Sequence, residues 1–189
     1  AAVIIKKMTA SFGALQGNTL NLNDGLNIIT ADNETGKSTW SHFIRAMLYG
    51  IDTSQRSKGG SIPDKVRFKP WNGANMEGTM ELEAWGRPVR LTRSTQSASA
   101  PMRKFSAVFT DTGSDVENIS GESAGQRFTG VEQPVFRRSC FIDQGALAID
   151  RTAELERRIQ ALVSTGDEQS AYSEADERLR AWLRKIRYN

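Results

Sequence analysis

The residues with the clearest capacity for chemistry lie in the segment "NIITADNETGKSTW", residues 27–40. A phosphate-binding loop needs small residues so that backbone N–H groups can point inward, a lysine that reaches the β- and γ-phosphates, and a hydroxyl that ligates magnesium. Gly36, Lys37 and Ser38 fill the last three positions of the pattern G-x-x-x-x-G-K-[ST]. Ala31 stands where that pattern begins with glycine, and alanine tolerates a positive φ less well. The segment therefore predicts nucleotide binding.

The sequence on either side of this loop predicts the elements that must position it. Leu26–Ile29 is a short apolar run, and it is expected to be a strand that leads into the loop. In Ser38–Tyr49 the apolar residues recur at helical spacing, and Gly50 supplies a stop. The positive end of the helix dipole would then lie at the loop, where it favours phosphate.

The rest of the chain up to residue 110 is predicted to be mostly strands. Short strands are expected at Ala2–Ile5 and Thr19–Leu22, and "FSAVFTD" is expected to form another. The stretch "GTMELEAWGRPVRLTRS" alternates apolar and polar residues on both sides of a turn, as a hairpin with one wet face does. Residues 51–76 predict a long loop with one ordered anchor, "RFKPWNG".

Two helices are predicted at the C-terminal end. The first begins near Thr152 and ends near Ser164. In the second, apolar residues follow the spacing of a heptad seam, which fits either the start of a coiled coil or an ordinary amphipathic helix: Ala175, Leu179, Trp182 and Ile186. The chain ends with the pattern still running, so truncation is expected. We therefore expect an α/β fold with an antiparallel β portion near the N-terminus, a central strand–loop–helix unit in residues 1–150, and a helical exit in residues 151–189.

Composition removes several classes of function. No apolar run approaches the length of a membrane span and no secretory signal opens the chain, so a cytoplasmic protein without membrane association is expected. Cys140 is the single cysteine, which excludes an internal disulfide or a cysteine-based zinc cluster, and its apolar neighbours predict a core position. His42 is the single histidine and is interpreted as structural.

Positive charge is concentrated in the middle third of the sequence. Residues 45–104 hold eleven basic and five acidic side chains. The cluster within this stretch fits either a patch that faces an anion such as DNA or an ordinary solvated loop, and it comprises Arg56, Lys58, Lys65, Arg67 and Lys69.

The class of nucleotide-binding protein is narrowed by what the sequence lacks. It has no N-K-x-D motif, which a GTPase would use to recognise its base, and no lid or acceptor signature of a small-molecule kinase. No run of four apolar residues ends in Asp-Glu, so the acidic strand that holds magnesium in such enzymes is missing. The segment "ISGES", residues 119–123, is predicted to be a turn.

Four blocks, in order, resemble the N-terminal half of the bacterial SMC-like ATPases of the SbcC and YhaN type, which are ABC-type ATPases involved in DNA repair: "GLNIITADNETGKSTWSHFIRAMLYGI", "RFKPWNG", "MELEAWGRPVRLTRS" and "VFRRSCFIDQGAL". The resemblance covers most of residues 3–165. It implies an ABC-type P-loop lobe that binds ATP and Mg²⁺. Where many relatives carry a basic residue after the aromatic of the first strand, this chain has Gly13 after Phe12.

The resemblance also implies roles for individual residues. Lys37 would bind the β- and γ-phosphates and Ser38 would ligate magnesium. Gln144 would meet the magnesium and the attacking water, at the end of a buried strand formed by "SCFID". The remaining phosphate oxygens would be held by Thr39 and by the amides of Asn33, Glu34, Thr35 and Gly36.

The same resemblance places the acidic strand and the signature motif in a C-terminal half beyond a coiled coil. Hydrolysis would then require that half, and the complete protein would dimerise with ATP sandwiched between its heads and act on DNA. Two alternatives remain at this point: a regulatory nucleotide-binding module that never hydrolyses, and an unrelated P-loop kinase.

Overall fold

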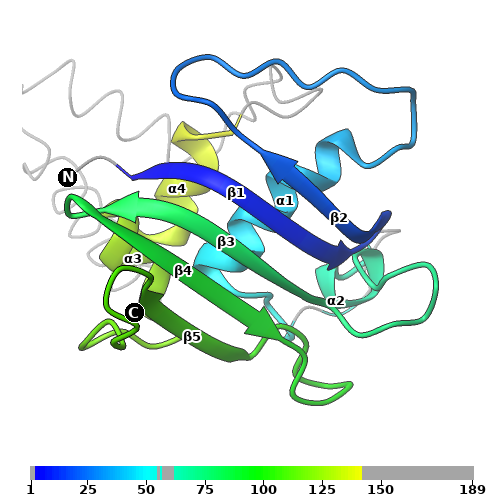
Figure 1. The fold of residues 1–189 in the computed structure, drawn as a ribbon. Coiled ribbons are helices and arrows are strands. Elements are labelled where there is room, and N and C mark those ends of the chain that lie inside the picture. Colours follow the sequence, from blue (N-terminus) through cyan, green and yellow to red (C-terminus); the bar gives the residue numbers. More distant parts are fainter. Residues whose placement is uncertain (1–2, 55, 57–61, 142–189) are drawn as a thin grey trace, which may run out of the picture. The chain divides into compact units, whose positions relative to one another are not determined.

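The computed structural model describes residues 3–54, 56 and 62–141. The chain divides into two units, Ala1–Phe141 and Ile142–Asn189, and the described residues all belong to the first. This unit is built on one five-stranded sheet with the order β2-β1-β3-β4-β5, in which every pair of neighbours is antiparallel (Figure 1). The strands are β1 (Ile4–Phe12), β2 (Leu15–Asn21), β3 (Glu77–Ala84), β4 (Arg87–Ser94) and β5 (Lys104–Phe109).

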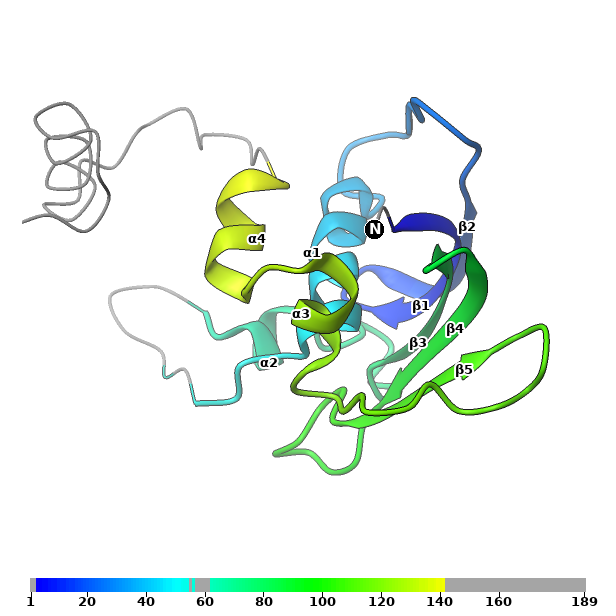
Figure 2. The same cartoon turned by 90° about the vertical axis from the view of Figure 1, so that its left-hand side faces the viewer.

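Helices lie on one face of this sheet (Figure 2). They are α1 (Lys37–Tyr49), α2 (Asp64–Arg67), α3 (Ala124–Thr129) and α4 (Gln133–Ser139). Within the part of the chain that the structure describes, none of the helices has the length and apolar character needed to cross a bilayer. The fold is therefore α/β, with the antiparallel sheet extending well beyond the N-terminal region to which the sequence assigned it.

Helix α1 sits close to the sheet because β3 carries a glycine beneath it. Phe43 of α1 is fully buried, and a Cβ atom on Gly78 would lie 2.3 Å from the Cζ atom of its ring. Any side chain at position 78 would push the helix away from the sheet. At the other end of α1 the Tyr49 hydroxyl shares a hydrogen bond of 2.7 Å with the Thr129 hydroxyl of α3. These contacts fix α1 along the middle of the sheet.

A buried arginine of the sheet holds the C-terminal end of α1. Arg93 occupies an inward position of β4, next to Val89 and Leu91 in the alternation, and only 2% of it is exposed. Its guanidinium donates to the carbonyl oxygens of Met47 (2.8 Å) and Leu48 (3.3 Å), which are among the last carbonyls of the helix.

Arg93 also binds the loops around that helix end. Its guanidinium donates to the carbonyls of Met102 (3.1 Å) and Gly121, and it lies 4.7 Å from the centre of the Phe105 ring. Burial lowers the pKa of Arg93 to about 10, which is still far above neutral pH, so the side chain keeps its charge. A cation at the negative end of a helix dipole is stabilising, and here it satisfies four carbonyl oxygens at once.

Several expectations from the sequence are confirmed. The helix after the glycine-lysine pair spans Lys37–Tyr49 and stops at Gly50, whose φ is 77°. The hairpin of β3 and β4, the strand β5 and the turn at residues 119–123 are present. The first two strands are longer than predicted, and residues 51–76 contain the short helix α2.

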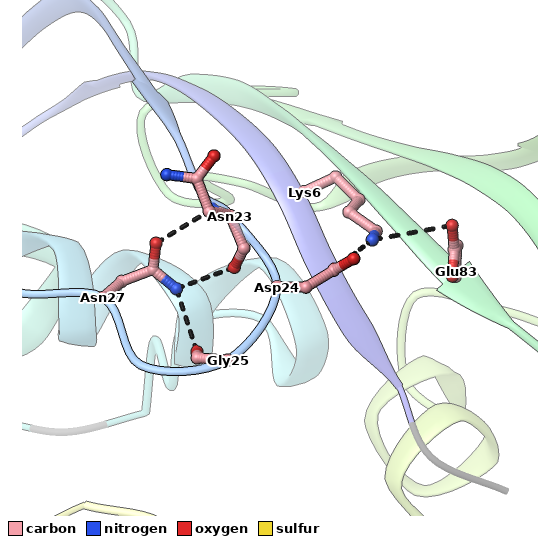
Figure 3. A network of polar contacts seen from close by, with 6 residues as sticks. All are labelled: Lys6, Asn23, Asp24, Gly25, Asn27 and Glu83. Atoms are coloured by element: carbon pink, nitrogen blue, oxygen red, sulfur yellow. Dashed lines mark hydrogen bonds and ion pairs between the residues drawn. The ribbon is translucent and has the colours of Figure 1, made fainter.

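The predicted strand at Leu26–Ile29 is absent, so that prediction is wrong. After β2 the chain turns at Asn23–Gly25, where the Asn27 side chain bonds Asn23 at both its N–H and its carbonyl and also bonds the Gly25 carbonyl. Lys6 of β1 forms ion pairs with Asp24 and, at 3.7 Å, with Glu83 of β3 (Figure 3).

The apolar residues that follow this turn find no neighbouring strand among the described residues. Leu26 is 89% exposed and Ile28 is 78% exposed. An apolar run becomes a strand only where another strand can accept its hydrogen bonds. The segment before the phosphate loop therefore has strand-like composition without strand structure.

The predicted buried strand "SCFID" is also wrong over its first three residues, none of which is in a strand. Ser139 ends helix α4, and Cys140 caps that helix and is exposed, so it is not the core residue that the sequence suggested. Phe141 is half-buried, and its ring lies 5.2 Å from that of Phe136. Ile142 and Asp143 of this segment, with Gln144 and the two predicted C-terminal helices, lie outside the described residues.

The Arg93 contacts predict a large effect on stability. Arg93→Met would leave the final carbonyls of α1 without a donor in a buried site, so we expect the free energy of unfolding to fall by about 3 kcal/mol. Urea denaturation followed by circular dichroism measures this. Arg90→Met on the same strand is the control: Arg90 is exposed and paired with Glu81 at 3.1 Å, so its loss should cost only about 0.5 kcal/mol. Equal losses in the two variants would contradict the role given to Arg93.

Candidate functional site

The loop that precedes α1 is closed by the side chain of its own lysine. Lys37 is the first residue of α1, and its ammonium group donates to the carbonyl oxygens of Ala31 and Asp32. The Thr35 hydroxyl donates to the Asp32 carbonyl at 2.7 Å. Residues 31–35 thus form a compact loop around the lysine, and their side chains face solvent.

Two residues of the loop adopt the left-handed backbone conformation. Gly36 has a φ of 94°, and a Cβ atom there would lie 2.9 Å from a methyl carbon of buried Leu15, so both conformation and space require glycine. Glu34 has a φ of 66°. Ala31 is not among the residues with a positive φ, so the alanine in place of the first glycine of the pattern imposes no backbone strain.

The N-terminal end of α1 is open to an anion. No side chain caps it, and its first turn contains no acidic residue. The first N–H groups of any helix lack acceptors within the helix, and together with the dipole they attract negative charge. Ser38 is exposed at the second position of the helix and Thr39 is half-buried at the third. A phosphate group would therefore meet backbone N–H donors, an ammonium and a hydroxyl in one small region.

The turn between β1 and β2 packs against the phosphate loop and the start of α1. A Cβ atom on Gly13 would lie 3.2 Å from the Thr39 methyl group, and Leu15 packs against Gly36. Gly13 has a φ of 57°, a conformation that a basic residue at this position would adopt only with strain. Gly13 therefore allows the turn to pack closely against α1.

Gly13 also joins the phosphate loop to the segment after α2. Its N–H donates to the Phe68 carbonyl at 2.7 Å, and its carbonyl accepts from the Trp71 N–H at 3.3 Å. Phe68 is buried, stacks on Phe12 with ring centres 4.8 Å apart, and lies 4.8 Å from the His42 ring of α1. His42 therefore packs as the structural residue that the sequence suggested.

The sequence predicted "RFKPWNG" as an ordered anchor, but nothing in its spacing indicated that Gly13 and Thr39 would be its neighbours. Arg93 was not predicted as a functional or positioning residue. Its inward place in the alternation of β4 is the feature that could have identified it.

The residues of the loop from 31 to 35 and Ser38 are exposed. A cavity of about 340 Å³ lies beside Arg93, and Tyr49, Gly50 and Glu122 are among its lining residues. This cavity is at the C-terminal end of α1, about 20 Å along the helix from Lys37, so it is separate from the loop.

Among the residues that the structure describes, no group of three or more His, Cys, Asp or Glu side chains could hold a metal ion. Magnesium would have to be held by groups such as the Ser38 hydroxyl together with phosphate oxygens and water.

The structure brings Asn33, Glu34, Thr35, Gly36, Lys37, Ser38 and Thr39 together at the start of α1. Gln144, the remaining predicted site residue, lies outside the described part of the chain.

Comparison with known families agrees with this geometry. Residues 10–185 match a family model described as an AAA domain. No curated protein matches the chain. The match covers the end of β1, the other four strands, the phosphate loop and all four helices. The chain therefore belongs to the AAA-domain family of P-loop ATPases.

Proposed function

We propose that this chain binds Mg²⁺-ATP at the loop of residues 31–36 and at the start of α1, and that it hydrolyses ATP when a C-terminal half completes the site. The observation that carries the proposal is the Lys37 ammonium folded against the Ala31 and Asp32 carbonyls, beside a helix end that has no cap. In the proposed complex Lys37 binds the β- and γ-phosphates, and Ser38 ligates magnesium. Thr39 and the amides from Asn33 to Gly36 hold further phosphate oxygens.

A second half is proposed because the chain by itself supplies only part of a hydrolytic site. Its sequence has no apolar strand ending in Asp-Glu, and such a carboxylate is needed to hold magnesium and polarise water. The apolar segment that leads into the loop is exposed at Leu26 and Ile28, and strands from another part of the protein would bury it. We further propose that the complete protein is an SMC-like ATPase of the SbcC or YhaN type, which dimerises around ATP and acts in DNA repair.

The alternatives are less well supported. Membership of the AAA-domain family weighs against an unrelated P-loop kinase. A regulatory module that binds nucleotide without hydrolysis would share the same loop, so only turnover by the completed protein separates it from the proposed ATPase.

Lys37→Ala tests nucleotide binding. Loss of the ammonium removes charge-assisted contacts to phosphate, so calorimetry should show Mg²⁺-ATP affinity falling by roughly ten- to a hundredfold. Lys104→Ala removes an exposed lysine of β5 and serves as the control, with unchanged affinity expected. Equal ATP affinity of Lys37→Ala and the unaltered chain would refute the proposed site.

Hydrolysis is tested by adding the C-terminal half. The chain alone should turn over ATP at the background rate, and mixing with the C-terminal half should restore activity because magnesium and water then have their carboxylate. In that mixture Gln144→Ala should slow turnover by roughly a hundredfold while ATP affinity changes little, since a neutral side chain that positions water acts mainly in the transition state. Gln126→Ala, an exposed glutamine of α3, is the control. Steady hydrolysis by the chain alone, abolished by Lys37→Ala, would contradict the proposed dependence on a second half.

The basic cluster supports DNA as a partner of the proposed ATPase. Arg56, Arg67 and Lys69 are exposed, whereas Lys65 is half-buried and donates to the Thr53 carbonyl at 3.1 Å. Lys58 lies outside the described residues. Exposed cations can contact DNA phosphates, so Arg56, Arg67 and Lys69 carry this part of the proposal.

Neutralising these three residues together to Gln should weaken binding to duplex DNA uniformly across sequences. It should also reduce the slope of log affinity against log salt concentration by about three, because three fewer counterion-releasing contacts are made. The control with the same loss of charge replaces three other exposed residues: Arg90 on β4, Arg103 just before β5, and Lys104 at the start of β5. Fluorescence anisotropy at several salt concentrations measures both quantities. If the two triple variants show the same slope of log DNA affinity against log salt concentration, the cluster does not contact DNA and is ordinary surface charge.

A further inference from the structure

Trp71 is a large aromatic side chain held at the surface close to the phosphate loop. It is 69% exposed, although Phe68 and Pro70 in the same segment are buried. Arg67 and Lys69 in the same segment are exposed. A tryptophan this exposed contributes little to the core, so its position calls for a reason other than folding.

The backbone that carries Trp71 is firmly attached. Its N–H donates to the Gly13 carbonyl at 3.3 Å, and the Phe68 carbonyl accepts from the Gly13 N–H at 2.7 Å. The Phe68 ring stacks on Phe12 at an angle of 13° between the ring planes. The backbone of Trp71 is thus tied to the turn that follows β1. Helix α2, which precedes this segment, lies near the end of β1 (Figure 1).

That support is shared with the phosphate loop. The turn formed by Gly13, Ala14 and Leu15 packs against Thr39 and Gly36, where Cβ atoms at Gly13 and Gly36 would come within 3.2 and 2.9 Å of their neighbours. The same turn also binds the Phe68–Trp71 segment through the backbone of Gly13. A Cβ atom at Gly13 would lie close to both Thr39 and Phe68, so the segment that carries Trp71 and the start of α1 contact the same short turn.

We propose that Trp71 stacks on the base of the nucleotide whose phosphates the loop holds. This inference rests on the proposed nucleotide binding at Lys37 and extends it to a second subsite. An exposed indole offers a flat π surface, and stacking between a base and an aromatic side chain contributes binding energy without reading the edges of the base. The cations at Arg67 and Lys69 suit a neighbouring polyanionic ligand. The subsite accordingly favours nucleotides over inorganic polyphosphate and discriminates little between ATP and GTP.

The test compares ligands that do and do not carry a base. Calorimetry is performed with Mg²⁺-ATP, Mg²⁺-GTP and Mg²⁺-tripolyphosphate on the full 189-residue chain. Trp71→Ala should weaken binding of ATP and of GTP by about tenfold each, and binding of tripolyphosphate should not change. Trp71→Phe should keep most of the nucleotide affinity because it keeps an aromatic face. The control is Trp85→Phe. Trp85 lies in the β3–β4 turn and stacks on Phe128 of α3, so this variant should bind all three ligands like the unaltered chain.

The outcomes distinguish a failure of the base subsite from a failure of the proposed nucleotide binding. If Lys37→Ala abolishes ATP binding while Trp71→Ala leaves it intact, the phosphate site stands and the base subsite is refuted. An equal weakening of ATP and tripolyphosphate by Trp71→Ala would also refute it, because the effect would then be on the loop. A loss of affinity for a single-stranded oligonucleotide with ATP affinity unchanged would assign Trp71 to nucleic acid instead. If the unaltered chain binds none of the three ligands, the proposed function and this inference both fall.

Discussion

The position of α1 depends on the contact between the Arg93 guanidinium and the last carbonyls of that helix. A helix has a positive end and a negative end, and both leave backbone groups without partners. In this molecule the negative end is satisfied internally, by a buried cation that bonds Met47, Leu48 and two loop carbonyls. The positive end has no cap and no acidic side chain in its first turn. The fold thus fixes one end of α1 and leaves the other available to a negatively charged ligand.

Glycines in β3 and α3 make this arrangement possible because they let the side chains of α1 approach closely. Gly78 lets Phe43 approach β3, and Gly125 of α3 does the same for Tyr49, whose ring atoms would lie 2.2 Å from a Cβ atom there. With α1 held at its middle and at its C-terminal end, the place of Lys37 follows from helix geometry. A substitution far from the loop, at position 78 or 93, would therefore displace the loop itself.

Local patterns in the sequence were enough to predict α1 and the hairpin of β3 and β4, because helical spacing and period-two alternation reflect which face of each element is buried. The phosphate loop was also predictable from a local pattern, because Gly36, Lys37 and Ser38 are contiguous in the sequence. The failures concern features that depend on distant residues. Leu26–Ile29 has the composition of a strand but no partner among the described residues, and Cys140 follows a helix that turns it to the surface. The neighbourhood of Trp71, Gly13 and Thr39 is assembled from three separate segments, so no spacing rule could have shown it.

The exposed segment before the loop links assembly to nucleotide binding in the proposed complete protein. Burying a leucine or isoleucine side chain contributes about 1.5 to 3 kcal/mol, so a strand from a second half that covered Leu26 and Ile28 would gain several kcal/mol. Pairing would also fix the backbone that runs directly into Ala31 and Asp32, whose carbonyls bind the Lys37 ammonium. A loop already ordered by its neighbours loses less conformational entropy when it closes on phosphate. Assembly would therefore strengthen ATP binding, and by linkage ATP would strengthen assembly by the same factor.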